Sequence, residues 1–317
     1  MPAGAGEVGR GMDEQRQGVV FGAGAYLIWG LFPLFWPLLE PSSAVEVLAH
    51  RVAWSMVFVA LLLLLRRRWA WVRELGWRRA GLLAVAATVV SVNWGLYIWG
   101  VSNGHVVETS LGYFINPLVS VLLGVTLLSE RMRRGQWTAL GLGTLAVLVL
   151  AVDYGRPPWL ALTLAFSFAT YGLIKKQVGV GAMEGLGTET ALLTLPAVGF
   201  IGWLVATGDS TFGTDGVGHA LLMALSGPVT AIPLLLFAGA ARRLPLSLLG
   251  LLQYLAPVLQ FGFGVLLLGE PMPAARLAGF ALVWLALVIF AVEGVRHSRR
   301  TRLAVPAAGP VTVRAAA

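Results

Sequence analysis

The chain has 317 residues, of which 57% are hydrophobic and 12% are charged, and soluble domains carry about twice that charged fraction. This composition excludes a soluble globular protein, and the absence of cysteine excludes disulfides and cysteine-based metal sites. The net charge of +8 does not indicate a nucleic-acid partner, because the basic residues follow the pattern of a membrane protein.

Ten apolar runs follow one another along the chain, and each approaches the ~20 residues that a helix needs to cross a bilayer. The expected spans are 19–38, 44–65, 80–101, 106–128, 136–152, 158–176, 186–206, 218–241, 246–268 and 273–293. Each span is expected to be helical, because a backbone in lipid must satisfy its own hydrogen bonds. We expect a cytoplasmic tail at 1–17 without a cleaved signal peptide, and a basic, disordered cytoplasmic tail at 295–317.

The basic residues predict the orientation of these spans. If the N-terminus faces the cytoplasm, all of the 23 Lys and Arg residues except Arg51, Arg156 and Arg276 fall in cytoplasmic segments. Short cytoplasmic loops of membrane proteins carry such an excess of Lys and Arg. We therefore expect a multi-pass protein of the plasma membrane with both termini in the cytoplasm.

One segment of the chain is duplicated. Leu111–Glu130 recurs at Leu251–Glu270 with a constant offset of 140 residues, and Pro117 and Pro257 occupy the same position in the two copies. Because five spans precede the second half, that half enters the membrane from the opposite side, as in transporters with inverted repeats. The expected fold class is an all-α integral membrane protein with ten transmembrane helices in two inverted five-helix repeats. The two repeats are expected at 18–153 and 154–294.

Seven motifs carry a resemblance to a known family. They are WGLFPLFW (29–36), EVLAHRVAWS (46–55), NWGLYIW (93–99), SLGYFINPL (110–118), YGLIKK (171–176), VTAIPLLLFAGAARRLPLS (229–247) and LLQYLAP (251–257). Through them the chain resembles the RarD family, in the EamA branch of the drug/metabolite transporter superfamily, from about Gly18 to Glu293. The resemblance implies a ten-helix inner-membrane permease for small molecules, built from two EamA-type repeats. The label of the family mentions chloramphenicol.

Arg51 is the ionisable residue that lies well inside a predicted span. A guanidinium keeps its proton in proteins, and charged groups in membranes usually face the bundle interior and have a partner. Glu46 shares a helix face with His50 rather than with Arg51, whereas Glu189 occupies the repeat-related position in the second half. We hypothesise an Arg51–Glu189 pair across the repeat interface. Direct contact of Arg51 with a substrate and snorkelling towards the headgroups remain alternatives.

Other ionisable residues lie near the ends of the predicted spans. Lys175 is expected to snorkel, with a substrate role as the alternative. Glu130 and Glu270 are expected to mark helix ends or to pair with loop arginines rather than to carry protons.

Aromatic and amide side chains gather in the interior of several spans. The candidates for lining a substrate route at mid-membrane are Trp29, Glu46, His50, Arg51, Asn93, Trp94, Tyr97, Tyr113, Asn116, Tyr171, Lys175, Glu189, Gln253 and Tyr254. Pro117 and Pro257 are expected to kink their helices and to free a backbone carbonyl beside these groups. Aromatic faces would bind a flat or cationic solute. The alternative is that the tryptophans mark the membrane interfaces.

These observations favour a secondary transporter, either a permease or an exporter, which moves a small organic solute or drug-like metabolite by alternating access. No Walker motif is present, so ATP is not the expected driver. We expect no catalytic residue, metal, cofactor or nucleic-acid partner; the partners are the solute and the bilayer, and a homodimer stays open. The alternatives are a membrane enzyme, for which the usual His- and Ser-based motifs are missing, and a non-transporting sensor or scaffold.

Overall fold

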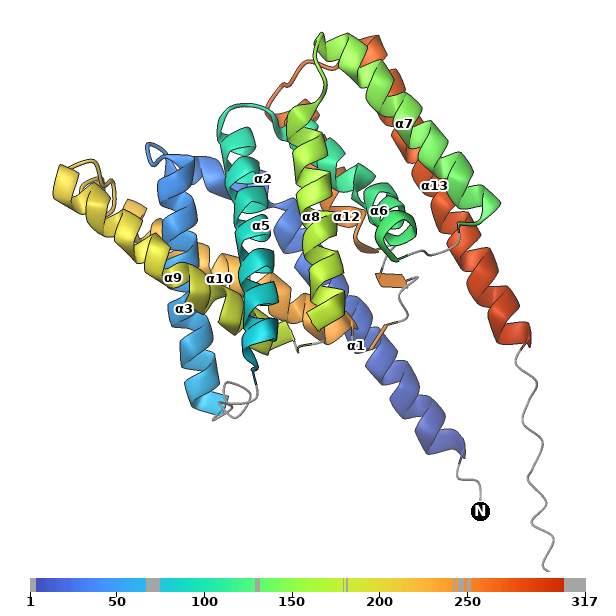
Figure 1. Ribbon diagram of the computed structural model, residues 1–317, viewed down its shortest axis with the longest axis horizontal. Helices are drawn as coiled ribbons and strands as arrows, with labels where there is room; N and C mark the ends of the chain where they lie inside the picture. The colour runs from blue at the N-terminus through green and yellow to red at the C-terminus, as the bar shows by residue number, and fades with distance from the viewer. Residues whose placement is uncertain are drawn as a thin grey trace, which may run out of the picture.

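The computed structural model describes residues 4–66, 75–128, 132–178, 180, 182–241, 243–244, 248–249 and 252–304. All regular secondary structure in this part of the chain is helical (Figure 1). The elements are α1 (Gly4–Gly30), α2 (Phe32–Phe35), η1 (Trp36–Leu39), α3 (Ala44–Arg66), α5 (Trp77–Ser102), α6 (Val106–Leu128), α7 (Arg134–Tyr154), α8 (Trp159–Val178), α9 (Ala182–Thr207), α10 (Gly216–Ala241), α12 (Leu255–Gly262), η2 (Phe263–Leu267) and α13 (Ala274–Ala304). Glu130, the end of the first duplicated segment, lies outside the described residues.

Most of the described helices can cross a membrane. Seven of them are long and apolar enough to do so on their own, namely α3, α5, α6, α7, α9, α10 and α13. The end of α1 forms a further candidate span together with α2 and η1, with a bend of 41°. Two shorter apolar segments, Trp159–Lys175 and Leu255–Leu267, lie within the expected spans 158–176 and 246–268. The prediction of an all-helical, multi-pass membrane protein is confirmed. Fewer than ten of the described helices are long and apolar enough to count as spans on their own, so the predicted number of ten is not confirmed.

Prolines explain the bent first span. Pro33 and Pro37 lie in the first turns of α2 and η1. A proline is tolerated there because its missing N–H would have no partner inside the helix, but it cannot continue the preceding helix. The apolar run predicted at 19–38 is therefore divided near Leu31.

The structure adds detail to three sequence-based expectations. Helix α1 begins at Gly4, inside the expected tail 1–17, and α13 continues to Ala304, beyond the expected end at residue 293. Arg, Glu and Gln are good helix formers, so a helix outside the apolar region does not need a hydrophobic sequence. Pro257 lies in the first turn of α12, directly after an interruption at Gln253 and Tyr254. Pro117, in contrast, lies inside the continuous helix α6.

The helices pack in a regular pattern. Helix α1 packs against α10, and α8 packs against α5. Helix α3 contacts both α9 and α10, and α6 contacts both α8 and α12. The long helices α7 and α13 lie side by side at one edge of the molecule, away from α3, α9 and α10 (Figure 1). Among the seven long helices, α6, α3 and α5 are the most buried, whereas α9 is the least buried.

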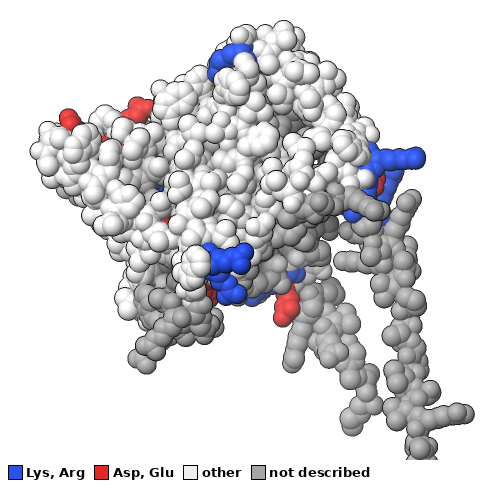
Figure 2. All heavy atoms as spheres, in the orientation of Figure 1, with Lys and Arg blue, Asp and Glu red and all other residues white. Residues whose placement is uncertain are grey.

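Exposed charged side chains gather at the two ends of the described bundle (Figure 2). The N-terminal end of α1 and the C-terminal end of α13 extend from the same end (Figure 1), where Arg78, Arg79 and Arg134 are exposed. Figure 2 shows a broad surface without Lys, Arg, Asp or Glu between this end and the other. Large apolar side chains such as Leu195 and Leu266 are more than 80% exposed, as expected for a surface that faces lipid.

Glu270 joins the connection before α13 to the start of α6. Its Oε1 atom accepts a hydrogen bond from the backbone N–H of Val106 (2.5 Å), and its Oε2 atom accepts one from Val107 (2.9 Å). Burial raises the pKa of the Glu270 carboxyl above its usual range, and these two hydrogen bonds oppose that change. Glu270 thus caps the N-terminus of another helix, where the helix dipole favours a negative charge. The expectation that it pairs with a loop arginine missed this role.

Helices α3 and α10 approach closely because a glycine lies between them. A Cβ atom at Gly227 would overlap the backbone of Trp54, coming within 2.6 Å of its carbonyl oxygen. The hydroxyl of Ser55 on the same turn of α3 donates a hydrogen bond to the carbonyl oxygen of Gly227 (3.3 Å). Small residues allow this kind of helix contact in membranes.

We expect Gly227→Ala to destabilise the protein by about 1–3 kcal/mol, because the added methyl group forces two helix backbones apart. Gly218 lies in the same helix and has no atom within 4 Å of its virtual Cβ. Gly218→Ala is therefore expected to be neutral or slightly stabilising. Thermal unfolding of both purified variants in detergent measures the difference. Equal melting temperatures would contradict the close contact at Gly227.

Candidate substrate site between the helices

Arg51 lies in a buried cluster between α3, α5 and α10. The residue is 2% exposed, and its Nε–H donates a hydrogen bond to Oγ1 of Thr230 (2.6 Å). Its Cζ atom lies 4.1 Å from the ring centroid of Trp94, 5.0 Å from that of Trp36 and 5.6 Å from that of Phe32. We call these five residues the arginine cluster. Aromatic faces and one hydroxyl surround the charge, which is an arrangement that holds a cation by cation–π attraction.

A second set of polar groups adjoins the arginine cluster. Nδ2 of Asn93 donates to the backbone carbonyl of Leu164 in α8 (2.9 Å), and the hydroxyl of Tyr113 donates to Oδ1 of Asn93 (3.1 Å). The ring of Tyr97 lies 5.5 Å from that of Tyr113 and 6.4 Å from that of Phe32. Asn93 and Tyr97 are four residues apart on α5, so they share one helix face. The structure therefore brings together five of the predicted site residues: Arg51, Asn93, Trp94, Tyr97 and Tyr113.

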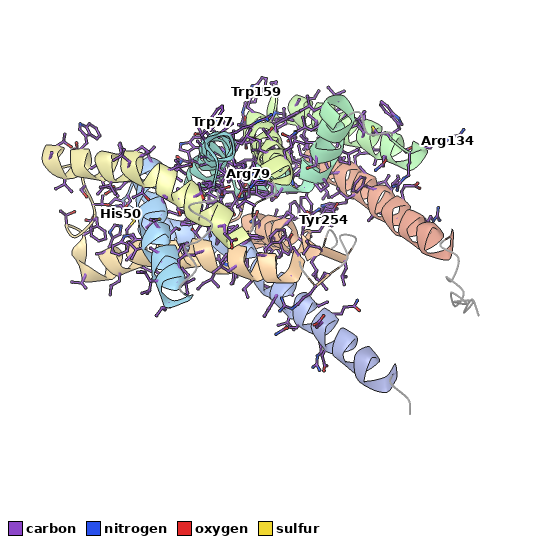
Figure 3. All side chains as sticks on the ribbon, turned by 60° about the horizontal axis from the view of Figure 1, so that its bottom comes forward. His50, Trp77, Arg79, Arg134, Trp159 and Tyr254 are labelled. Carbon is purple, nitrogen blue, oxygen red and sulfur yellow. The ribbon has the colours of Figure 1, made fainter. Side chains whose placement is uncertain are left out.

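Glu46 and His50 hold the connection between α9 and α10 against α3. The carboxylate of Glu46 accepts hydrogen bonds from the backbone N–H of Thr211 (2.8 Å) and from Oγ of Ser210 (3.3 Å). The imidazole of His50 stacks on Phe212 with 4.6 Å between ring centroids. Figure 3 shows His50 in the part of the molecule that α3 forms with α9 and α10. The end of α9 therefore meets the beginning of α3, and these two helices run in opposite directions.

Lys175, Glu189 and Tyr171 form a closed ionic group between α8 and α9. Nζ of Lys175 lies 2.7 Å from Oε1 of Glu189, and the hydroxyl of Tyr171 donates to Oε2 (3.1 Å). The side chain of Glu189 is 4% exposed and that of Lys175 is 22% exposed. Lys175 therefore forms an ion pair inside the bundle, and the expectation that it snorkels was wrong.

The hypothesised pair between Arg51 and Glu189 is also wrong. Both oxygens of Glu189 bind side chains of α8, and Arg51 binds Thr230. Each residue lies seven positions after the start of its own helix, which is ~10 Å along the helix axis. Because α3 and α9 start at opposite ends of the bundle, the two residues lie at different depths, roughly 10 Å apart in a ~30 Å hydrocarbon core. Lys175 is near the end of α8, at the depth where α9 begins.

The remaining predicted residues lie elsewhere. The ring of Trp29 packs against Tyr26 and Phe237, and its carbonyl accepts a hydrogen bond from Gln260. Tyr254 packs against the hydrophobic cluster formed by α6, α7, α8 and α13, and Figure 3 shows it well apart from His50. Asn116 has a buried Oδ1 atom without a partner among the described residues, and Gln253 lies partly buried in the turn before α12.

Sequence reasoning missed the partners that come from distant segments. Thr230 could have been noticed as a hydroxyl in the apolar helix α10. Phe32 and Trp36 come from the short segment after α1, and Phe212 from a loop, so nothing in the local pattern predicts their contact with α3. Within the described part of the chain, no group of three or more His, Asp or Glu residues could hold a metal ion.

The comparison with known proteins identifies the family of the chain. The EamA-like transporter family matches residues 16–152. Protein RarD of Streptomyces exfoliatus is 62% identical over 303 residues, which cover 95% of this chain and 96% of that protein. The chain belongs to the RarD family of EamA-like transporters. A further relative is an uncharacterised transporter of Pseudomonas aeruginosa, 44% identical over 90% of this chain and 96% of that protein.

A solved structure shares the fold of this chain. A crystal structure of a protein with 18% sequence identity superimposes with a TM-score of 0.55, covering 88% of this chain and 98% of that chain. At this identity the likeness shows the fold alone. Together with the apolar helices, membership of the RarD family makes this chain a membrane transporter of the drug/metabolite group, and the relatives are named transporters rather than enzymes.

We expect Glu189→Leu to destabilise the protein by about 3 kcal/mol, because it leaves the charge of Lys175 without its partner in a mostly buried position. The double variant Lys175→Met, Glu189→Leu is expected to regain most of this loss, since an apolar pair of similar volume needs no counter-charge. Tyr171→Phe removes one hydrogen bond and should cost about 1 kcal/mol. Thermal unfolding in detergent measures these three variants and the single variant Lys175→Met. Strictly additive effects of the two single changes would show that the pair is not coupled.

Proposed function

We propose that the protein is a secondary transporter that moves a small organic solute across the plasma membrane by alternating access. The observation that carries this proposal is the buried polar and aromatic cluster around Arg51 in a bundle of membrane helices. Ionisable residues inside a membrane mark substrate and ion pathways, because the energetic cost of burying them is otherwise not tolerated. In the absence of a Walker motif in the sequence, the driving force is a solute or ion gradient rather than ATP.

The proposed architecture consists of two inverted repeats, 18–153 and 154–294, with the route between them. In this arrangement α8 is the repeat-related equivalent of α1, and α10 is the equivalent of α5. The packing supports it, because α1 contacts α10 and the equivalent pair, α8 and α5, is also in contact. The same exchange pairs α3 with α9, α6 with α12 and α7 with α13, and each of these pairs is in contact. Transporters with inverted repeats place their substrate sites near mid-membrane at the repeat interface.

The proposed orientation places both termini in the cytoplasm. Because the chain has no cysteine, single cysteines can be introduced into the otherwise unchanged protein. We expect Asp215→Cys, in the exposed connection before α10, to react with a membrane-impermeant maleimide in intact cells. Gly76→Cys, exposed at the start of α5, is expected to react only after permeabilisation. Labelling of both positions from the same side would overturn the proposed topology.

Transport itself is tested by counterflow in proteoliposomes with labelled amino acids, organic acids, quaternary amines and chloramphenicol. We expect at least one solute to be exchanged faster than by liposomes without protein. Trp94→Ala removes the nearest aromatic face from Arg51 and is expected to lower that rate about tenfold, which corresponds to 1–2 kcal/mol. Trp203→Ala, which alters a tryptophan that is 56% exposed on α9, serves as the control and should leave the rate unchanged. Absence of counterflow for every solute would favour the sensor or scaffold alternative.

A further inference from the structure

We propose that the arginine cluster binds the carboxylate group of an organic solute. This inference rests on the proposed function, because Arg51 is 2% exposed and a solute reaches it only through the rearrangement that a transport cycle provides. Of the two kinds of solute expected from the sequence, flat or cationic, it argues against the cationic one. The guanidinium already lies against the faces of Trp94 and Trp36, so a second cation would meet a like charge there.

The polar groups of the arginine cluster that lack a hydrogen-bond partner are donors. Nη1 of Arg51 and Nε1 of Trp36 are buried and have no partner among the described residues. Guanidinium and indole N–H groups can donate but cannot accept. The hydroxyl of Tyr97 is also buried without a partner in the described part of the chain, and it too can donate. An occupant that satisfies these groups must therefore bring acceptor atoms.

The charge of Arg51 requires that this acceptor be an anion. The ion pairs seen among the described residues are Arg156–Glu108, Lys175–Glu189 and Arg276–Asp153, and none of them includes Arg51. Glu46, the carboxylate on the same helix, binds the α9–α10 connection instead. A buried charge without a counter-ion is unfavourable by several kcal/mol. A neutral amide or alcohol would satisfy the N–H groups but would leave that charge uncompensated.

The guanidinium is held so that one edge remains available. Thr230 donates its own proton to the carbonyl of Ser226 (2.8 Å) and accepts from Nε of Arg51 (2.6 Å), so its hydroxyl has a fixed orientation. Trp94 lies 4.1 Å from Cζ and limits rotation of the group. With Nε occupied, the edge formed by Nη1 and Nη2 remains, and its two parallel N–H groups match the two oxygens of a carboxylate.

The surroundings indicate an organic acid rather than an inorganic ion. Phe32, Trp36 and Trp94 present aromatic surface beside the guanidinium. Small-molecule sites combine such apolar walls with a few polar groups that fix orientation. A chloride or phosphate ion would gain nothing from these rings, whereas the apolar body of an organic acid would be buried against them.

The experiment measures binding by thermal shift of the full-length protein in detergent, with acids and their neutral amides as matched probes. The acids are acetate, benzoate, 3-phenylpropionate and indole-3-acetate, and sodium chloride and sodium phosphate are tested alongside. We expect at least one aromatic acid to stabilise the wild type and its amide to bind at least tenfold more weakly. Arg51→Met, which keeps the volume of the side chain, should weaken binding of that acid about tenfold or more, as for the loss of a charge-assisted hydrogen-bonded pair.

Two further variants keep the test decisive. Arg51→Lys retains the charge but lacks the two-pronged edge, so it should bind the acid with intermediate affinity even if Arg51→Met does not fold. Arg276→Gln removes an arginine that pairs with Asp153 at the end of the bundle and should leave acid binding unchanged. The inference is overturned if no acid binds better than its amide, if all Arg51 variants bind like the wild type, or if chloride competes as well as the aromatic acids.

Counterflow separates this inference from the proposed function. A shift that is specific for acids and depends on Arg51, without counterflow of the same acid, would keep the anion site and overturn transport. Counterflow of neutral or cationic solutes at the same rate in Arg51→Met and wild type would keep transport and overturn the anion site.

Discussion

The structure depends on the burial of one permanent positive charge among membrane helices. Arg51 cannot lose its proton, and placing such a group at the centre of a membrane helix costs roughly 2.5–3.5 kcal/mol on insertion scales. The protein offsets this with the faces of Trp94 and Trp36, since a desolvated cation–π contact contributes about 2 kcal/mol. The hydrogen bond to Thr230 adds about 1.5–3 kcal/mol, as is usual when one partner is charged. The charge is thus stabilised without a bound solute, while the outer N–H groups of the guanidinium stay available.

The second buried ionic group resolves the same problem differently. Lys175 and Glu189 neutralise each other, and Tyr171 binds the second carboxylate oxygen. This group has little hydrogen-bonding capacity left on its acid and needs no external partner to be stable. The two groups lie at corresponding positions of the proposed repeats, one closed and one open. A site between two related halves can therefore be asymmetric in charge. Only the half with Arg51 carries a charge that a solute would neutralise.

The sequence predicted membrane helices and the burial of Arg51 because both follow from local rules. An apolar run long enough to cross lipid must be helical, and a charge within it must be buried against protein. It did not predict the partner of Arg51, since that depends on depth. Residues equally far from the starts of two antiparallel helices are separated along the membrane normal, and this is invisible in a comparison of sequence positions. Phe32 and Phe212 were missed for a related reason, because they lie in short or irregular segments whose path depends on tertiary packing.

At the end of the bundle opposite the termini, polar contacts of moderate strength connect loops to helix ends. Glu46 binds the backbone of the α9–α10 connection, His50 stacks on Phe212, and Glu270 caps α6. Each such hydrogen bond contributes about 1–3 kcal/mol, which is comparable with the interaction that an anion would gain at Arg51. These contacts join loops to helix ends rather than helix to helix, so they can be released without unpacking α3 from α10 at Gly227. In the proposed transport cycle, the close helix contacts move as a unit while the polar contacts at this end open and close, and Arg51 moves with the unit that carries Thr230.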